Sequence, residues 1–176
     1  ASTEKVTMGL AAAMDPETEG ATGVTFPGFF AMVARRHMRD YGTTIKQLAL
    51  VSVKNHHNSQ FNPRARFRNP ATLEEVLNSR PITDPLKLFD CCPITDGAAA
   101  AVLCPADRAH EFTSKPIDLA GSGQAIGLDD LHQHGSLTIL PSTIMAAQQA
   151  YEQAGIKPED IDVVELHDCF TIAEIV

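Results

Sequence analysis

Long apolar runs are absent from this sequence of 176 residues, and so are the marks of an export signal. No stretch approaches the roughly 20 apolar residues that a membrane-spanning helix needs. The first residues, ASTEKVTMGL, have neither the basic start nor the apolar core of a signal peptide. We therefore expect no transmembrane segment and no export from the cell.

Basic residues are also scarce. Lys and Arg together number 14 against 22 Asp and Glu, which gives a formal net charge of -8. Binding to the phosphates of nucleic acids depends on basic side chains, so this balance argues against a general affinity for nucleic acid.

Cysteine is limited to four residues, two of them adjacent, and no CxxC pair occurs. This pattern is typical neither of a disulfide framework nor of a zinc site, and we expect free thiols in a reducing compartment. Two close histidine pairs lack carboxylates or thiols at ligand spacing, so we expect no metal. These pairs are His56 with His57 and His132 with His134.

Helical periodicity and capping residues are present in several segments. Residues 26–42 predict a helix that ends at Gly42, and residues 45–60 predict a second helix capped by Thr43 or Thr44. Residues 72–79 begin with a capping box. A longer helix is expected within residues 140–161, starting at Ser142 or Thr143 and ending at Gly155, while residues 11–23 and 61–70 have loop composition.

Strands are expected between these helices. The apolar, β-branched run 161–166 predicts a buried strand, residues 116–127 a strand that ends in a Gly-rich turn, and the first residues of the chain a possible strand. The small-residue run 98–104 is compatible with a helix by propensity or with a closely packed strand, and we favour the strand. The alternation of strands and helices predicts an α/β architecture with right-handed crossovers.

Three reactive side chains follow the strand-like run in VVELHDCFTIAEIV (163–176), and CFTIAEIV (169–176) has the apolar spacing of a starting helix. Residues two apart in extended chain project to the same face, so His167 and Cys169 can converge while Asp168 turns away. A thiol at a helix N-terminus has its thiolate favoured, and an imidazole N–H can stabilise an oxyanion. The alternative is a buried structural cysteine beside a histidine bonded to a backbone carbonyl.

A second cluster is the basic stretch KNHHNSQFNPRARFRN (54–69). Such a local cationic patch suits the phosphates of a small anionic ligand, although a solvated basic loop has the same composition. Its candidate binding residues are Lys54, His56, Arg64, Arg66 and Arg68. Cys91 or Cys92 could be a nucleophile, but a buried role as a small hydrophobic residue is commoner. The segment GSGQAIG (121–127) lacks the full nucleotide-binding spacing.

Three of these segments together resemble a known family. VVELHDCFT, CCPITDGAAAAVLCP and KNHHNSQFNP closely resemble the thiolases of the sterol carrier protein x type, and TEKVTMG resembles a segment that follows the first catalytic region of thiolases. The resemblance implies a partial, thiolase-like αβαβα layered fold with a mainly helical loop domain. It places residues 1–10 at the end of the N-terminal half, 11–90 in the loop domain, 91–106 back in the N-terminal half and 107–176 in the C-terminal half.

The resemblance also implies a reaction. Thiolases cleave a 3-ketoacyl-CoA with CoA, or run the reverse Claisen condensation, in lipid and sterol side-chain metabolism. His167 would donate an oxyanion-hole hydrogen bond, Cys169 would be the acid/base at the acetyl carbon, and the basic residues of the loop domain would lie near the CoA phosphates. We expect CoA as co-substrate, no tightly bound cofactor, and a homodimer or higher oligomer, cytoplasmic in a microbe or peroxisomal in an animal.

Two thiolase features have no counterpart in these residues, namely the nucleophilic cysteine and the Gly-His-Pro histidine that activates it. We therefore expect a fragment of a longer enzyme that is inactive by itself. Two rival interpretations are a thiolase-like aldol lyase acting on steroid-CoA esters and a noncatalytic acyl-CoA or lipid-binding module.

Overall fold

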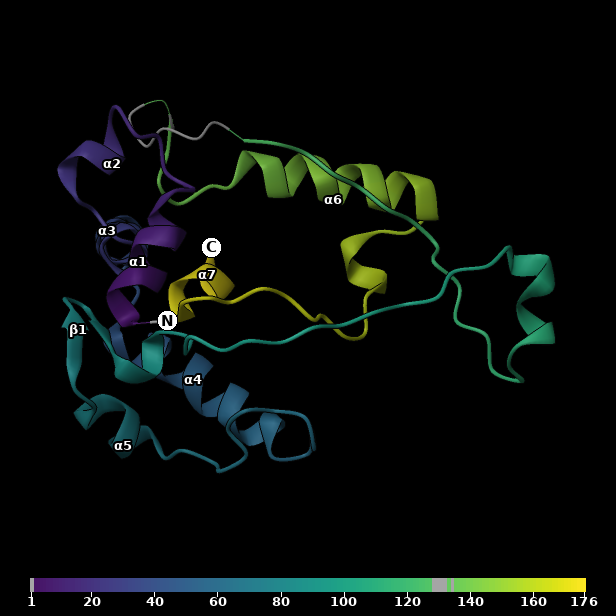
Figure 1. Cartoon of the computed structure of the whole chain (residues 1–176), viewed down its shortest axis with the longest axis horizontal. Helices are drawn as coiled ribbons and strands as arrows, with labels where there is room; N and C mark the ends of the chain where they lie inside the picture. The colour runs from purple at the N-terminus through teal and green to yellow at the C-terminus, as the bar shows by residue number, and fades with distance from the viewer. Residues whose placement is uncertain (1, 128–132, 134) are drawn as a thin grey trace. The chain divides into compact units, whose positions relative to one another are not determined.

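The computed structural model describes residues 2–127, 133 and 135–176 (Figure 1). The chain divides into two compact units, which are described separately. The first unit comprises residues 1–92, 128–140 and 165–176, and the second comprises residues 93–127 and 141–164. Among the described residues, no helix is both long enough and apolar enough to cross a membrane.

Helices dominate the first unit, and those expected inside it are confirmed. Helix α3 (Phe26–Tyr41) ends at Gly42, whose φ of 73° is the left-handed conformation that glycine adopts without strain. Helix α4 (Ile45–Ser59) begins at Thr44, which forms a capping box with Gln47. Thr44 is thus the cap, and Thr43 is not.

The next elements are short. Helix α5 (Leu73–Asn78) has the expected capping box between Thr72 and Glu75. Strands β1 (Pro81–Thr83) and β2 (Leu86–Lys87) then form an antiparallel hairpin with Pro81 opposite Lys87, and the 3-10 turn η1 (Leu88–Asp90) follows it. Helix α7 (Thr171–Ile175) is the helix start expected after Cys169.

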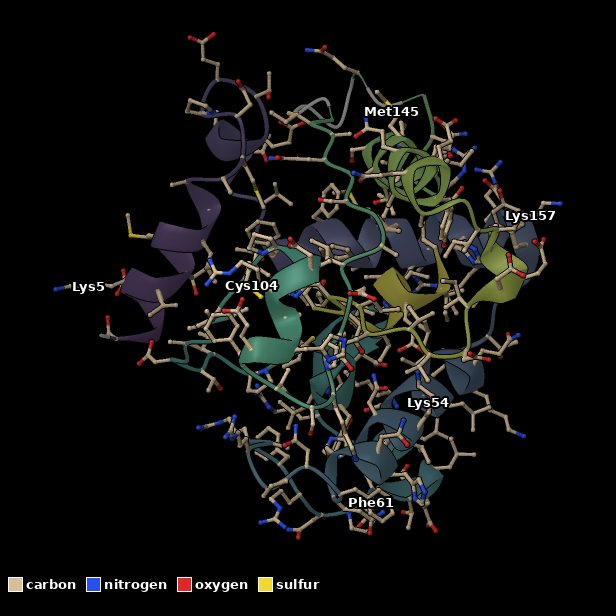
Figure 2. All side chains as sticks on the ribbon, turned by 90° about the vertical axis from the view of Figure 1, so that its right-hand side faces the viewer. Lys5, Lys54, Phe61, Cys104, Met145 and Lys157 are labelled. Atoms are coloured by element: carbon tan, nitrogen blue, oxygen red, sulfur yellow. The ribbon has the colours of Figure 1, made fainter. Side chains whose placement is uncertain are left out.

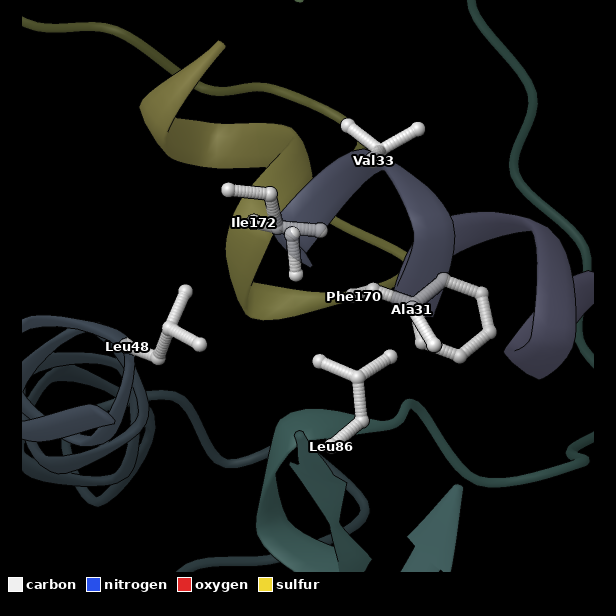
Figure 3. Packing of buried hydrophobic residues seen from close by; sticks show 7 residues of the cluster. Ala31, Val33, Leu48, Leu86, Phe170 and Ile172 are labelled. Carbon is white, nitrogen blue, oxygen red and sulfur yellow. The ribbon is translucent and has the colours of Figure 1, made fainter. Parts of the chain in front are cut away.

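The main core of the first unit joins elements that are far apart in the sequence. Figure 3 shows Leu48 of α4, Leu86 of β2 and Ile172 of α7 around a common centre, and all three side chains are fully buried. The remaining members of the cluster are Ala31, Val33, Ala34 and Phe170. Burial of these side chains fixes α7, and with it the residues just before it, against α3, α4 and the hairpin.

The beginning of the chain differs from expectation. Residues Thr3–Ala11 form helix α1, capped by the Ser2 hydroxyl, and not a strand. The expected loop 11–23 contains a short helix, α2 (Glu19–Thr22), with Gly23 in the left-handed conformation after it. A serine cap followed by a glutamate in the first turn favours the helix at this position.

The predictions of three strands later in the chain are also wrong. Residues 98–104, 116–127 and 161–166 are extended or irregular, and β1 and β2 are the only strands in the part of the chain that the structure describes. Apolar side chains of these segments face solvent, with Val102 98% exposed, Ile117 97% and Val163 84%. A strand forms only where a neighbouring strand accepts and donates its backbone hydrogen bonds, and within the described ranges no strand pairs with these segments.

The second unit is organised around helix α6 (Pro141–Ala154), which ends at Gly155 as expected and starts one residue before Ser142. The segment 121–124 lies along it, because the backbone amides of Ser122 and Gln124 donate to the side chains of Gln153 and Gln149. A Cβ atom at Gly121 or Gly123 would overlap the α6 backbone, so this Gly-rich segment packs against a helix. The 3-10 turns η2 (Ala106–Glu111) and η4 (Pro158–Asp160) complete the unit.

Candidate functional site

The segment His167–Asp168–Cys169, called the HDC block below, is held at the start of α7 by pairing with the chain near Cys91. Cys91 and Phe170 form an antiparallel bridge, and the amide of Cys92 donates to the carbonyl of Cys169 at 3.0 Å. The Phe170 ring is buried and stacks on Phe30 with ring centroids 4.6 Å apart. The backbone at Cys169 and Phe170 is therefore held by the chain near Cys91.

A buried carboxylate strengthens this attachment. The Thr171 hydroxyl donates to Oδ1 of Asp90 at 2.8 Å, and the Lys87 amide donates to Oδ2 of Asp90 at 2.8 Å. Asp90 is only 4% exposed, so these bonds replace the water that the carboxylate loses. They join the first turn of α7 to the hairpin and η1.

The two predicted catalytic side chains lie in different surroundings. His167 is exposed, whereas Cys169 is half-buried. Burial raises the pKa of the Cys169 thiol, and the neighbouring Cys92 raises it further. The sequence-based expectation of a favoured thiolate is therefore wrong here, because desolvation outweighs the backbone N–H groups near this short helix. The surroundings of Cys169 therefore favour the protonated thiol over the thiolate.

Asp168 is tied to helix α4. The side-chain amide of Asn55 donates to Oδ2 of Asp168 and also to Oε2 of Glu174, the latter at 3.3 Å. Lys54 forms an ion pair with the same Glu174. Burial raises the pKa of Asp168 and the Glu174 charge adds to the increase, while Lys54 and Asn55 act in the opposite direction. Lys54, Asn55, Asp168 and Glu174 thus form one polar network between α4 and α7.

The five predicted phosphate-binding residues have different surroundings. Lys54, which extends from α4 in Figure 2, is engaged by Glu174. Nδ1 of His56 lies 3.1 Å from the carbonyl oxygen of Asn69, and its ring contacts Phe67 and Phe89. The three arginines are exposed in the loop after α4; they are Arg64, Arg66 and Arg68, with the Arg66 guanidinium 5.7 Å from the Phe67 ring centroid. Lys54 is the member of this set that belongs to the polar network around Asp168.

The adjacent cysteines Cys91 and Cys92 lie in surroundings that favour their protonated thiols. Burial raises the pKa of Cys91 to about 12, with Asp90 and Cys92 adding to the increase, and its thiol lies 3.4 Å from the carbonyl of Lys87. Burial also raises the pKa of Cys92. No group of three potential metal ligands occurs within the described ranges, and His132 and His134 lie outside the described residues.

An open pocket of about 340 Å³ lies beside α4 and α7. Lys54 and Glu174 are on its wall together with apolar side chains, and its lining contains no member of the HDC block. The full lining is Thr43, Gln47, Leu50, Val51, Lys54, Glu174 and Ile175.

Several residues that position the HDC block were not predicted from the sequence. Asn55 is the most informative, because it falls on the same face of α4 as the buried residues Leu48, Val51 and Ser52, at a spacing of three and four residues. A polar side chain on a core-facing stripe signals a buried partner. Glu174, Asp90 and Thr171 carried no such signal.

Comparison with known proteins gives consistent results. Residues 123–176 match the family described as "Thiolase C-terminal domain-like". The chain is 52% identical to acetyl-CoA acetyltransferase of Methanothermobacter thermautotrophicus over 94% of the chain and 43% of that protein. It is 36% identical to sterol carrier protein 2 of Oryctolagus cuniculus over 85% of the chain and 28% of that protein.

A solved structure is also similar. The structure described as "Ltp2-ChsH2(DUF35) aldolase" matches with a TM-score of 0.73 and 32% identity, covering 83% of the present chain and 40% of that chain. The present chain thus spans less than half the length of these two relatives and of this solved structure.

Proposed function

We propose that this chain, which belongs to the thiolase superfamily, supplies part of the active site of an acetyl-CoA C-acyltransferase. The thiolase-like α/β fold class predicted from the sequence is confirmed by the family match and the similar solved structure. The reaction we propose is thiolytic cleavage of a 3-ketoacyl-CoA, or the reverse Claisen condensation, with acyl-CoA and CoA as substrates and no tightly bound cofactor.

The observation that carries this proposal is the half-buried Cys169 thiol on a backbone that is held by the chain near Cys91. The hydrogen bond between Cys92 and Cys169 and the buried Phe170 hold the thiol in place. We assign Cys169 as the acid/base at the acetyl carbon and His167 as a hydrogen-bond donor to the thioester oxygen.

The raised pKa of Cys169 suits this thiol to donate a proton. Thiolysis releases the acetyl unit as a carbanion-like species, which must take up a proton from a protonated acid. A thiol that is mostly protonated at neutral pH is suited to donate this proton, whereas condensation needs its thiolate as a base. By microscopic reversibility the same residue, as its thiolate, takes the proton from acetyl-CoA in condensation, so we assign it to both directions of the reaction.

For the CoA phosphates we propose the exposed arginines Arg64, Arg66 and Arg68, with Lys54 and His56 at the adjoining end of α4. Guanidinium groups bind phosphate oxygens with two parallel hydrogen bonds, and exposed side chains can reorient to do so. Exchanging all three arginines for glutamine should raise KM for CoA and leave kcat almost unchanged.

The domain division expected from the resemblance stays part of the proposal: 1–10 and 91–106 in the N-terminal half, 11–90 in the loop domain and 107–176 in the C-terminal half. We further propose that the 176 residues do not turn over by themselves, since the thiolase nucleophile and its activating histidine have no counterpart among them. The complete protein would be a homodimer or higher oligomer of lipid or sterol side-chain metabolism, cytoplasmic in a microbe and peroxisomal in an animal.

The test uses the complete protein in which this sequence occurs. Cys169→Ala should lower kcat for thiolysis of acetoacetyl-CoA by about a hundredfold or more, which is the usual contribution of a positioned acid/base. Cys104→Ala is the matched control, because this thiol is exposed, and it should leave the rate within twofold. A Cys169→Ala enzyme that keeps its rate within a few-fold would contradict the assignment.

One rival function has a specific observation in its favour, the similarity to a solved structure described as an aldolase. Thiolysis requires free CoA and yields two CoA esters, whereas aldol cleavage proceeds without CoA and yields a carbonyl product. Product analysis with a 3-ketoacyl-CoA and a 3-hydroxyacyl-CoA, each with and without CoA, separates the two. A noncatalytic acyl-CoA-binding protein would bind CoA in titration and turn over neither ester.

A further inference from the structure

We propose that Asn55 is a positioning residue for the thiolase reaction, and that its side-chain amide holds the carboxylate of Asp168 and thereby the HDC block in which Cys169 stands. The inference rests on the proposed function for its kinetic consequence. The contact itself is a structural statement that can be tested without any activity.

The geometry around Asn55 is that of one amide shared by two carboxylates. Its Nδ2 donates to Oδ2 of Asp168 and to Oε2 of Glu174, and an NH₂ group has one hydrogen for each. Asp168 precedes Cys169 directly, and Glu174 lies in the helix that follows it. One side chain on α4 therefore holds the chain before and after the proposed acid/base.

The residue type fits this position better than its alternatives. An aspartate at position 55 would place a third carboxylate beside Asp168 and Glu174, and an apolar residue would leave both without this donor. Lys54 already supplies the cation, through Glu174. A neutral group with two hydrogens is therefore what the space between the two acids requires.

The charged and titratable groups facing Asp168 are few. Burial and Glu174 favour its protonated form, while a backbone hydrogen bond, Lys54 and Asn55 favour its ionised form. Asp168 in turn acts on Cys92 and Cys169. Loss of the Asn55 amide would remove a donor to the ionised form, and the pKa of Asp168 would rise further. The carboxylate would then lose its side-chain donor on α4 and keep only its backbone hydrogen bond, so its attachment to α4 would be lost.

The variants are Asn55→Leu, which has a similar shape without a donor, and Asn55→Ser, which is smaller and cannot reach both carboxylates. Asn58→Leu is the matched control, because Asn58 is exposed on the same helix. In the complete protein, we expect both Asn55 variants to lower kcat for thiolysis about tenfold or more, with KM for CoA changed less than threefold. The acid limb of the kcat profile should move to higher pH, and Asn58→Leu should alter none of these quantities.

A second measurement is the titration of the Asp168 carboxyl carbon by NMR, with Asp168→Asn to assign its signal. Its pKa should be higher in both Asn55 variants than in the unchanged protein. Unchanged kinetics, or a loss of kcat without a shift of the pH profile or of the Asp168 pKa, would overturn the positioning role. If the unchanged protein has no thiolase activity, the proposed function fails, and the NMR titration still decides whether Asn55 holds Asp168.

Discussion

The hydrogen bond between Thr171 and Asp90 attaches the first turn of α7, and through it the HDC block, to η1. The Thr171 hydroxyl donates to a carboxylate that is 4% exposed, and the bond is 2.8 Å long. Thr171→Val keeps the shape of the side chain and removes the donor. The Asp90 carboxylate then retains the Lys87 amide, and its burial limits the access of bulk water to the lost donor's place.

The size of the effect follows from the charge and the burial. A hydrogen bond to a charged group contributes about 1.5–3 kcal/mol, and an unsatisfied buried acceptor costs a similar amount. We therefore expect Thr171→Val to lower the local stability of this region by roughly 2 kcal/mol. Because 1.4 kcal/mol is a factor of ten, opening of the region should become about ten to a hundred times more frequent.

Amide hydrogen exchange measures this opening locally. The amide of Cys92, which donates to the Cys169 carbonyl, and the amide of Ala173, which donates to the Phe170 carbonyl, are the reporters. Both should exchange faster in Thr171→Val by the factor above. Thr171→Ser is the control, since it keeps the donor and loses only a methyl group. Equal exchange in the two variants would refute the importance of the hydroxyl and of the Asp90 contact.

Three further outcomes are expected. Leu48→Ala, at a fully buried site, should lower the free energy of unfolding by about 2–5 kcal/mol in denaturant titration. Leu50→Ala, at a partly exposed site on the same helix, should lower it by less than about 1 kcal/mol. Gly42→Ala should cost about 1 kcal/mol by the same measurement, because φ at this position is 73°. NMR titration should give Glu75 a pKa below its ordinary value of 4.5, because Thr72 donates hydrogen bonds to its carboxylate. This cap therefore contributes stability above pH 4.5, which is lost as the pH falls through the folded pKa. Thr72→Val should move the Glu75 pKa back towards 4.5.

The helices were predictable because their signals are local. Gly42, Thr44, Thr72 and Gly155 each mark a helix end through backbone conformation or a hydrogen bond to a residue within a few positions. Such interactions depend on neighbouring sequence alone. The exceptions are α1, which was expected to be a strand although its serine cap is present in the sequence, and the short α2, which lies in an expected loop.

The strand predictions were wrong because strand formation depends on distant parts of the chain. A strand depends on a partner that can be distant in the chain, and apolar composition alone supplies none. The run 161–166 has the composition of a buried strand, yet Val163 and Val164 are 84% and 67% exposed. Composition indicated which segments are suited to pairing, and only the three-dimensional structure shows whether pairing takes place.

The candidate site was predictable in part. The HDC block could be singled out because its reactive side chains are contiguous and the motif resembles a known one. The residues that hold the block in place could not be identified from the sequence. Asn55 and Asp168 are 113 positions apart, and Asp90 and Thr171 are 81 positions apart. The pKa direction of Cys169 also depends on burial by distant elements, and local reasoning from the helix N-terminus gave the wrong sign.

The most direct test of the proposed chemistry is the exchange of acetyl-CoA methyl protons with deuterium oxide, followed by NMR on the complete protein. If Cys169 moves the proton at the acetyl carbon, the unchanged protein should catalyse this exchange, and Cys169→Ala should reduce the exchange rate about a hundredfold or more. Exchange that continues at the original rate in Cys169→Ala would contradict the assignment of this thiol, and with it the central claim.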